Sequence, residues 1–122
     1  MAQKVLIVDD AKTIRQQVNF TLKKAGFEII EAEGGLDGIE KLKANRDVLL
    51  IVSDVNMPNL GGIEMVQAIN TNTELPHPPI LMLTTEDSPK FLEKAKVAGA
   101  KGWIVKPFLP EVLIQAVKRL IG

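Results

Sequence analysis

The chain has 122 residues, of which 46% are hydrophobic, and this length and composition predict one compact domain over residues 1–122. Its 15 basic residues balance its 15 acidic residues, so no overall charge favours nucleic acid or an anionic membrane surface. The absence of cysteine excludes disulfides and thiolate chemistry, and no apolar stretch approaches the ~20 residues that cross a bilayer, so we expect a cytoplasmic protein without membrane insertion.

Short apolar runs alternate along the chain with stretches of helical periodicity. In chain order, the pattern predicts a strand at 5–8, a helix over 14–25, a weaker strand at 27–32, a short helix at 39–42, a strand at 48–52, a helix over 63–69, a strand at 80–83, a helix over 91–98, a strand at 103–105 and a last helix over 112–120. Continuous apolar runs indicate strands that are buried on both faces. The alternation therefore predicts an α/β domain with a parallel sheet, right-handed crossovers and helices on both sheet faces.

Polar side chains follow the predicted strands at their carboxyl ends. Asp9 and Asp10 follow the first strand, Asp54 follows the third, Thr84 the fourth and Lys106 the fifth. In an open parallel sheet these ends share one edge, where ligands bind. We therefore expect three acids, a hydroxyl and a lysine to converge there.

Three neighbouring carboxylates repel one another, and one ammonium cannot balance them. A hard divalent cation with oxygen ligands suits such a cluster, and we expect Mg²⁺, since the chain lacks Cys and its single histidine, His77, lies in a proline-rich loop. The cation and Lys106 together leave room for an anionic phosphoryl group. Asp54 stands alone after its strand and is the candidate nucleophile, which would form an aspartyl-phosphate.

This set of residues resembles the signature of response-regulator receiver domains, over essentially the whole chain. It comprises Asp9-Asp10, Asp54, Thr84 and Lys106-Pro107, supported by Asn56-Met57-Pro58 and by Phe108. The resemblance implies a doubly wound, flavodoxin-like fold with five parallel strands in the order 2-1-3-4-5. It also implies that Asp10, Asp54 and the backbone carbonyl of Asn56 bind Mg²⁺ directly, while Asp9 acts mainly through metal-bound water.

The resemblance further implies a switch. Lys106 would pair with the phosphoryl oxygens, the Lys106-Pro107 peptide bond would be cis, and Thr84 would move toward the phosphoryl group. A ring in the fifth strand, here Trp103 instead of the commoner Tyr or Phe, would then change the surface formed by the fourth helix, fifth strand and fifth helix. Asn56 and Glu86 would tune the rate of dephosphorylation.

The same resemblance implies a monomer that takes its phosphoryl group from a histidine kinase and controls a protein partner. Within the family, the chain is most similar to single-domain chemotaxis regulators, which act on the flagellar motor switch. A phosphorelay shuttle, or a receiver with another protein target, is the alternative.

Three other classes are less compatible with the residues. A phosphatase with an Asp nucleophile needs a second acid where this chain has Asn56, so we expect no enzyme activity beyond self-phosphotransfer and autodephosphorylation. A flavin-binding domain needs a phosphate loop where the chain has Asp9 and Asp10. A degenerate receiver that only binds partners would not need the complete set of acids, Thr84 and Lys106.

Overall fold

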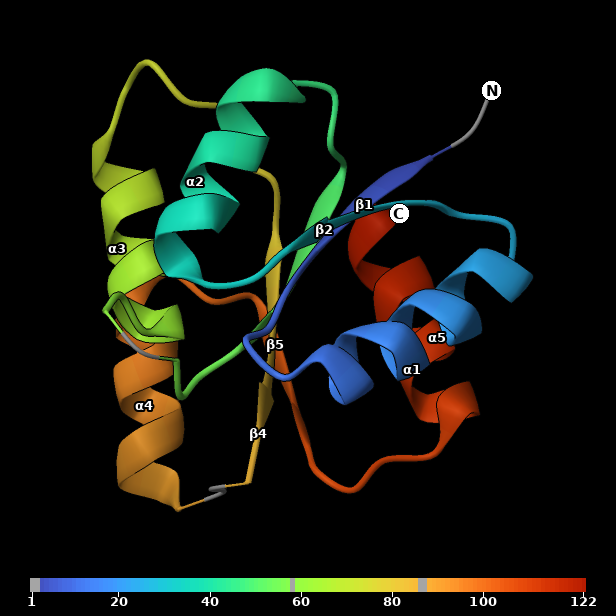
Figure 1. The fold of residues 1–122 in the computed structure, drawn as a ribbon. Helices are drawn as coiled ribbons and strands as arrows, with labels where there is room; N and C mark the ends of the chain where they lie inside the picture. Colours follow the sequence, from blue (N-terminus) through green and yellow to red (C-terminus); the bar gives the residue numbers. More distant parts are fainter. Residues whose placement is uncertain (1–2, 58, 86–87) are drawn as a thin grey trace.

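The computed structural model describes residues 3–57, 59–85 and 88–122 (Figure 1). In these ranges the chain alternates between strands and helices. The elements are β1 (Lys4–Val8), α1 (Lys12–Lys24), β2 (Glu28–Ala32), α2 (Gly35–Ala44), β3 (Leu50–Asp54), α3 (Gly62–Thr71), β4 (Ile80–Thr84), α4 (Pro89–Ala98), β5 (Gly102–Val105) and α5 (Pro110–Ile121). The strands form one parallel sheet in the order β2-β1-β3-β4-β5, which confirms the expected fold.

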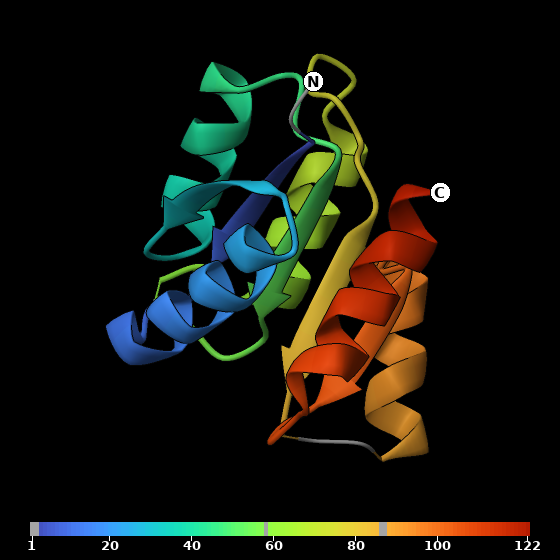
Figure 2. The ribbon, with the colours of Figure 1, turned by 90° about the vertical axis from the view of Figure 1, so that its right-hand side faces the viewer.

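Helices cover both faces of the sheet, with α2, α3 and α4 on one face and α1 and α5 on the other (Figures 1 and 2). Two hydrophobic cores fill the space between the layers. Successive residues of a strand point to opposite faces. In β4, Met82 packs in the core beneath α2, α3 and α4, whereas its neighbours Leu81 and Leu83 pack in the core beneath α1 and α5. This double burial explains the continuous apolar runs within β1, β3 and β4.

The helix predicted at 39–42 is longer in the structure, because α2 begins at Gly35. A Cβ atom on Gly38 would lie 2.9 Å from the sulfur of Met65 and 3.0 Å from a methyl group of Val8. A Cβ on Gly35 would collide with the backbone of Leu60. The glycines therefore allow α2 to pack closely against its neighbours.

The third strand lies further along the chain than predicted. It includes Ser53 and Asp54, whereas Val48 and Leu49 precede it. Asp54 is paired with Leu83 of β4, so its backbone belongs to the sheet. This register places the Asp54 carboxylate at the carboxyl edge.

The first turn of α3 lacks a capping side chain, because Gly61 is its N-cap residue. A Cβ on Gly61 would lie 2.8 Å from Glu64 Oε1, so the Glu64 carboxylate occupies space that a larger residue at position 61 would need.

Among the described residues, no helix has the length and apolarity to cross a membrane.

Candidate functional site

The three acids predicted from the strand ends lie together. Asp9 and Asp10 follow β1, and Asp54 ends the neighbouring strand β3. Each offers a carboxylate oxygen, and these oxygens all lie within 4.8 Å of one another. Lys106 follows β5 and reaches across the end of β4, where its Nζ donates a hydrogen bond of 2.9 Å to Asp54 Oδ1.

Alternation along the strands explains why these side chains meet. Asp9, Asp54 and Lys106 each lie two residues after a side chain of the core beneath α1 and α5, namely Ile7, Val52 and Ile104. Residues two apart in an extended chain point to the same side. The three polar side chains therefore continue one face of the sheet past its edge.

Asp9 is almost fully buried, with 1% of its surface exposed. Its Oδ1 accepts a hydrogen bond of 2.9 Å from the backbone N–H of Ala11, whereas its buried Oδ2 has no hydrogen-bond partner among the described residues. Burial raises the pKa of the Asp9 carboxyl above 3.8, and the negative charges of Asp54 and Asp10 act in the same direction. The carboxylate is thus in an environment that favours an added positive charge.

The residues present fit a divalent cation. Among the described residues, the cluster carries three carboxylates, and Lys106 contributes a single compensating charge, so the acids exceed the bases by two. The unpartnered Oδ2 of Asp9 is a buried oxygen donor beside two further carboxylates. Hard cations such as Mg²⁺ prefer an all-oxygen donor set of this kind.

Thr84 and Trp103 lie on the other face of the sheet. Thr84 is fully buried at the end of β4, two residues after Met82, which belongs to the core beneath α2, α3 and α4. Trp103 is paired with Met82 in the sheet and is partly buried against the same core. The backbone carbonyl of Thr84 accepts a hydrogen bond of 2.7 Å from the backbone N–H of Lys106, so the ends of β4 and β5 are joined beside the site.

The remaining candidates lie around this centre. Asn56 is exposed and, with Gly61 and Glu64, lines a separate hollow of about 530 Å³. The Lys106–Pro107 peptide bond is cis. Glu86 lies outside the described residues, so its predicted role in dephosphorylation stays a prediction.

His77 is exposed in the loop between α3 and β4, with Nε2 2.9 Å from the backbone oxygen of Asn72. That loop lies at the amino end of β4, opposite the edge that carries the acids.

Sequence reasoning missed the polar residues behind Asp9. Arg15 of α1 is 8% exposed, and its guanidinium donates a hydrogen bond of 2.8 Å to the backbone carbonyl of Asp9. It also contacts Glu31 of β2. A signal was available, because Arg15 lies three and seven residues before Val18 and Leu22, on the buried side of the helix. A charged residue at such a position requires a polar partner.

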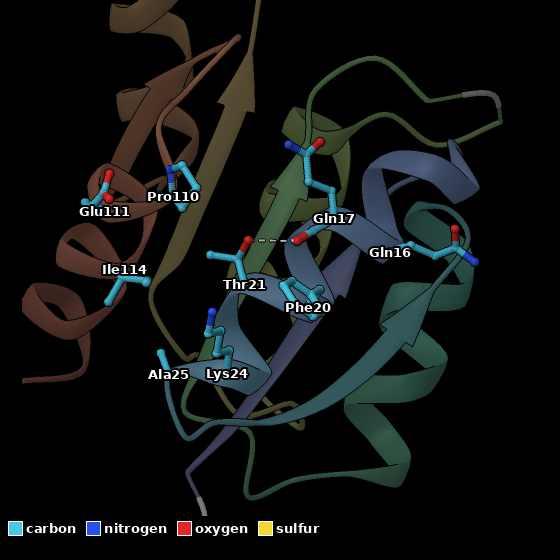
Figure 3. Close-up of a pocket in the computed structure, with 9 residues that line it drawn as sticks. All are labelled: Gln16, Gln17, Phe20, Thr21, Lys24, Ala25, Pro110, Glu111 and Ile114. Carbon is cyan, nitrogen blue, oxygen red and sulfur yellow. Dashed lines mark hydrogen bonds between the residues drawn. The ribbon is translucent and has the colours of Figure 1, made fainter.

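A larger hollow of about 710 Å³ lies between α1 and α5 (Figure 3). Phe20, Thr21 and Lys24 line it from α1, and Ile114 from α5. None of the three acids lines it. This hollow and the acid cluster are therefore different places.

Comparison with known proteins agrees with the site. A family model described as the response regulator receiver domain matches residues 5–118. The chemotaxis protein CheY1 of Helicobacter pylori is 38% identical over 120 residues, which cover 98% of this chain and 97% of the relative. The chemotaxis protein CheY homolog of Campylobacter jejuni is 36% identical over 98% of this chain and 92% of its own.

A solved structure of the chemotaxis response regulator CheY4 of Vibrio cholerae is 44% identical, with a TM-score of 0.91 over 98% of this chain and 99% of that one. A solved structure of a response regulator from Chloroflexus aurantiacus is 27% identical, with a TM-score of 0.91 over 99% of this chain and 98% of that one. The family match, the strand order and the acid cluster lead to one conclusion. The chain belongs to the response regulator receiver family, as a CheY-like receiver domain of two-component signalling.

Proposed function

We propose that Asp54 accepts a phosphoryl group from a phosphohistidine of a partner kinase, in a Mg²⁺-dependent reaction. The observation that carries this proposal is the position of the Asp54 carboxylate. It lies at the end of a buried strand, 2.9 Å from the Lys106 ammonium and within one cluster with Asp9 and Asp10. Asp9 is more buried than Asp54, which suits it to helping to hold a cation, whereas Asp54 forms an ion pair with Lys106.

In the transfer step, an oxygen of Asp54 forms a bond to phosphorus while the bond from phosphorus to the donor imidazole nitrogen breaks. The nitrogen keeps the electron pair and takes up a proton, and Asp54 becomes an acyl phosphate. Bound Mg²⁺ would offset the charge of the phosphoryl oxygens, with Asp10, Asp54 and the carbonyl of Asn56 as direct ligands and Asp9 acting through water. Lys106 stabilises the same oxygens, and the Thr84 hydroxyl donates a hydrogen bond to one of them.

The proposed output is a change at the surface formed by α4, β5 and α5. Thr84 and Trp103 lie on the same face of neighbouring strands, so movement of the threonine toward the phosphoryl group alters the packing available to the indole. The populations of two packings then shift, and a partner that binds this surface responds to the state of Asp54. Asn56 and Glu86 tune how long that state lasts.

We infer that the partner is the flagellar motor switch, since the relatives named above are chemotaxis proteins. We further propose that the receiver domain spans residues 1–122, works as a cytoplasmic monomer, binds no nucleic acid and turns over no external substrate.

Affinity capture with the phosphorylated chain tests the identity of the partner. Retention of a motor-switch component supports chemotaxis, whereas retention of a histidine phosphotransfer protein supports a phosphorelay shuttle.

Mass spectrometry tests the phosphoryl transfer itself. After incubation with acetyl phosphate and Mg²⁺, the protein should gain the mass of one phosphoryl group. The Asp54→Asn variant should gain none, because an amide oxygen is a poor nucleophile, and omission of Mg²⁺ should greatly slow the wild-type reaction. An equal gain in the variant would contradict the assignment of Asp54.

A further inference from the structure

A buried guanidinium lies directly behind the acid site. Arg15 Nη1 donates a hydrogen bond of 2.8 Å to the backbone carbonyl of Asp9, and Arg15 Nε donates one of 3.1 Å to Glu31 Oε1. The side chain thereby joins the first turns of α1 to the loop after β1 and to the edge strand β2. A buried arginine has to be held by acceptors, and here one of them belongs to a candidate metal ligand.

The second acceptor is itself fixed in place. Glu31 Oε2 accepts a hydrogen bond of 2.7 Å from Asn19 Nδ2, so the two oxygens of Glu31 have different partners. Glu31 also balances the charge of Arg15, with Glu33 at 4.0 Å from Nη2. Because Glu31 already neutralises the guanidinium, Arg15 affects the acid site mainly by holding the backbone carbonyl of Asp9 in place.

Arg15 completes a set of contacts that fixes Asp9. The Asp9 backbone N–H donates a hydrogen bond of 3.1 Å to the carbonyl of Ala32, and Asp9 Oδ1 accepts one from the N–H of Ala11. With the carbonyl held by Arg15, the Oδ2 atom is the part of Asp9 that lacks a partner among the described residues. The oxygen through which Asp9 would act on the cation, by way of metal-bound water, is thus set on a backbone that is restrained on several sides.

We propose that Arg15 is a positioning residue of the cation site, which holds the Asp9–Asp10 segment in its binding geometry before a cation arrives. Without this hydrogen bond, repulsion among the three carboxylates displaces the segment outward, and a buried carbonyl loses its partner. A cation would then have to reassemble its ligands, which lowers its affinity. This inference rests on the proposed function only in one respect, namely that the bound cation serves phosphoryl transfer.

Isothermal titration with Mg²⁺ alone tests the proposal. The Arg15→Gln variant should bind Mg²⁺ about tenfold more weakly than the wild type, the size of effect that loss of an outer contact produces at metal sites. Arg15→Lys should recover part of the affinity, because an ammonium can keep one of the two hydrogen bonds. A matched control is Lys4→Gln, which removes the 2.9 Å ion pair with Asp47 at the opposite end of β1 and should leave Mg²⁺ affinity unchanged.

Urea denaturation in EDTA separates positioning from general stability. If Arg15→Gln is less stable but binds Mg²⁺ with wild-type affinity, Arg15 only supports the fold and the proposal is wrong. Should Arg15→Gln fail to fold, Glu31→Gln replaces the charged acceptor by a neutral one, and we expect binding about threefold weaker. Unchanged affinity in that variant would equally overturn the proposal.

Failure of the proposed role of Arg15 and failure of the proposed phosphoryl transfer give different experimental results. The titration uses no phosphate, whereas phosphorylation is read by mass spectrometry on the wild type. A wild type that binds Mg²⁺ through Arg15 but gains no phosphoryl group would contradict only the proposed function. A wild type that binds no Mg²⁺ would overturn the role of Arg15.

Discussion

Asp9 is a carboxylate that folding removes almost completely from water, with 1% of its surface still exposed. Its pKa is raised, first by this burial and then by the neighbouring negative charges. The ionised side chain therefore destabilises the fold whenever no cation is bound. Burial of Asp9 therefore lowers the stability of the metal-free protein.

We expect Asp9→Asn to raise the free energy of unfolding in EDTA at neutral pH by about 1 kcal/mol, since the amide keeps an acceptor for Ala11 but carries no charge. Because the raised pKa belongs to the folded state, the wild-type penalty is complete above that pKa. It fades as the pH falls and is lost below the ordinary value of 3.8. Urea denaturation across this pH range should show the two stabilities converge at low pH.

Saturating Mg²⁺ provides the control for this comparison. The cation should stabilise the wild type more than Asp9→Asn, because a ligand stabilises the state that binds it. A wild type more stable than the variant at neutral pH in EDTA would show that burial of Asp9 is not unfavourable.

At the scale of elements, the start of α3 is packed against the end of β3. A Cβ atom on Gly62 would collide with the backbone oxygen of Asp54, and it would lie 2.7 Å from the terminal methyl of Met82 and 3.0 Å from Val55 Cα. The Gly62 N–H also donates a hydrogen bond of 2.9 Å to the carbonyl of Val55. The helix can approach β3 this closely only with glycine at that position.

Gly62→Ala should therefore lower the free energy of unfolding by about 2 kcal/mol, because backbone atoms have to move apart to admit the methyl group. It should also slow phosphorylation of Asp54 by acetyl phosphate, since the displaced atom belongs to that residue. Gly34→Ala is the matched control, as a Cβ there meets nothing within 4 Å. Equal unfolding midpoints for the two variants would contradict this account of Gly62.

The sequence predicted the central strands β1, β3 and β4 well because they are buried on both faces and so form continuous apolar runs, whereas the edge strand β2, with Glu28 and Glu31, gave a weaker pattern. The predicted boundaries of strands and helices were less accurate where strand pairing or close packing, and not apolarity, decides where an element begins or ends. Ser53 and Asp54 were expected to follow the third strand, yet pairing with β4 keeps them in the sheet. Helix α2 begins at Gly35, before the predicted helix, where close packing against Leu60 requires glycine. The convergence of Asp54 and Lys106 followed from strand ends sharing an edge. The contact between Arg15 and Glu31 depends on how α1 lies against β2, which periodicity cannot reveal.

Across the whole molecule, the sheet separates two groups of residues. Asp9, Asp54 and Lys106 continue the face that α1 and α5 cover, whereas Thr84 and Trp103 lie on the face that α2, α3 and α4 cover. The groups meet at the carboxyl edge, where the backbone of Lys106 donates to the carbonyl of Thr84. A signal from Asp54 to the partner surface would cross the sheet at this edge.

Trp103 is the single tryptophan of the chain, so its emission reports on that surface directly. Beryllofluoride with Mg²⁺, as a mimic of the phosphoryl group, should shift the emission and change its quenching by acrylamide, because the partly buried indole changes its packing. Asp54→Asn should abolish the response. Thr84→Val should weaken it, since that variant lacks the hydroxyl that is proposed to move toward the phosphoryl group. If the wild-type spectrum and its quenching stay constant, Trp103 is not the moving ring.

The division of the sheet into two faces has a consequence for how such a protein can diverge. If a partner binds the surface of α4, β5 and α5 as proposed, substitutions around Trp103 and on α4 alter what it recognises while lying across the sheet from Asp9, Asp54 and Lys106. After gene duplication, one copy can therefore acquire a new target while its carboxylates and lysine remain untouched. In this architecture the acid cluster can stay constant while recognition evolves, whereas Thr84, which shares a face with Trp103, would be constrained by both.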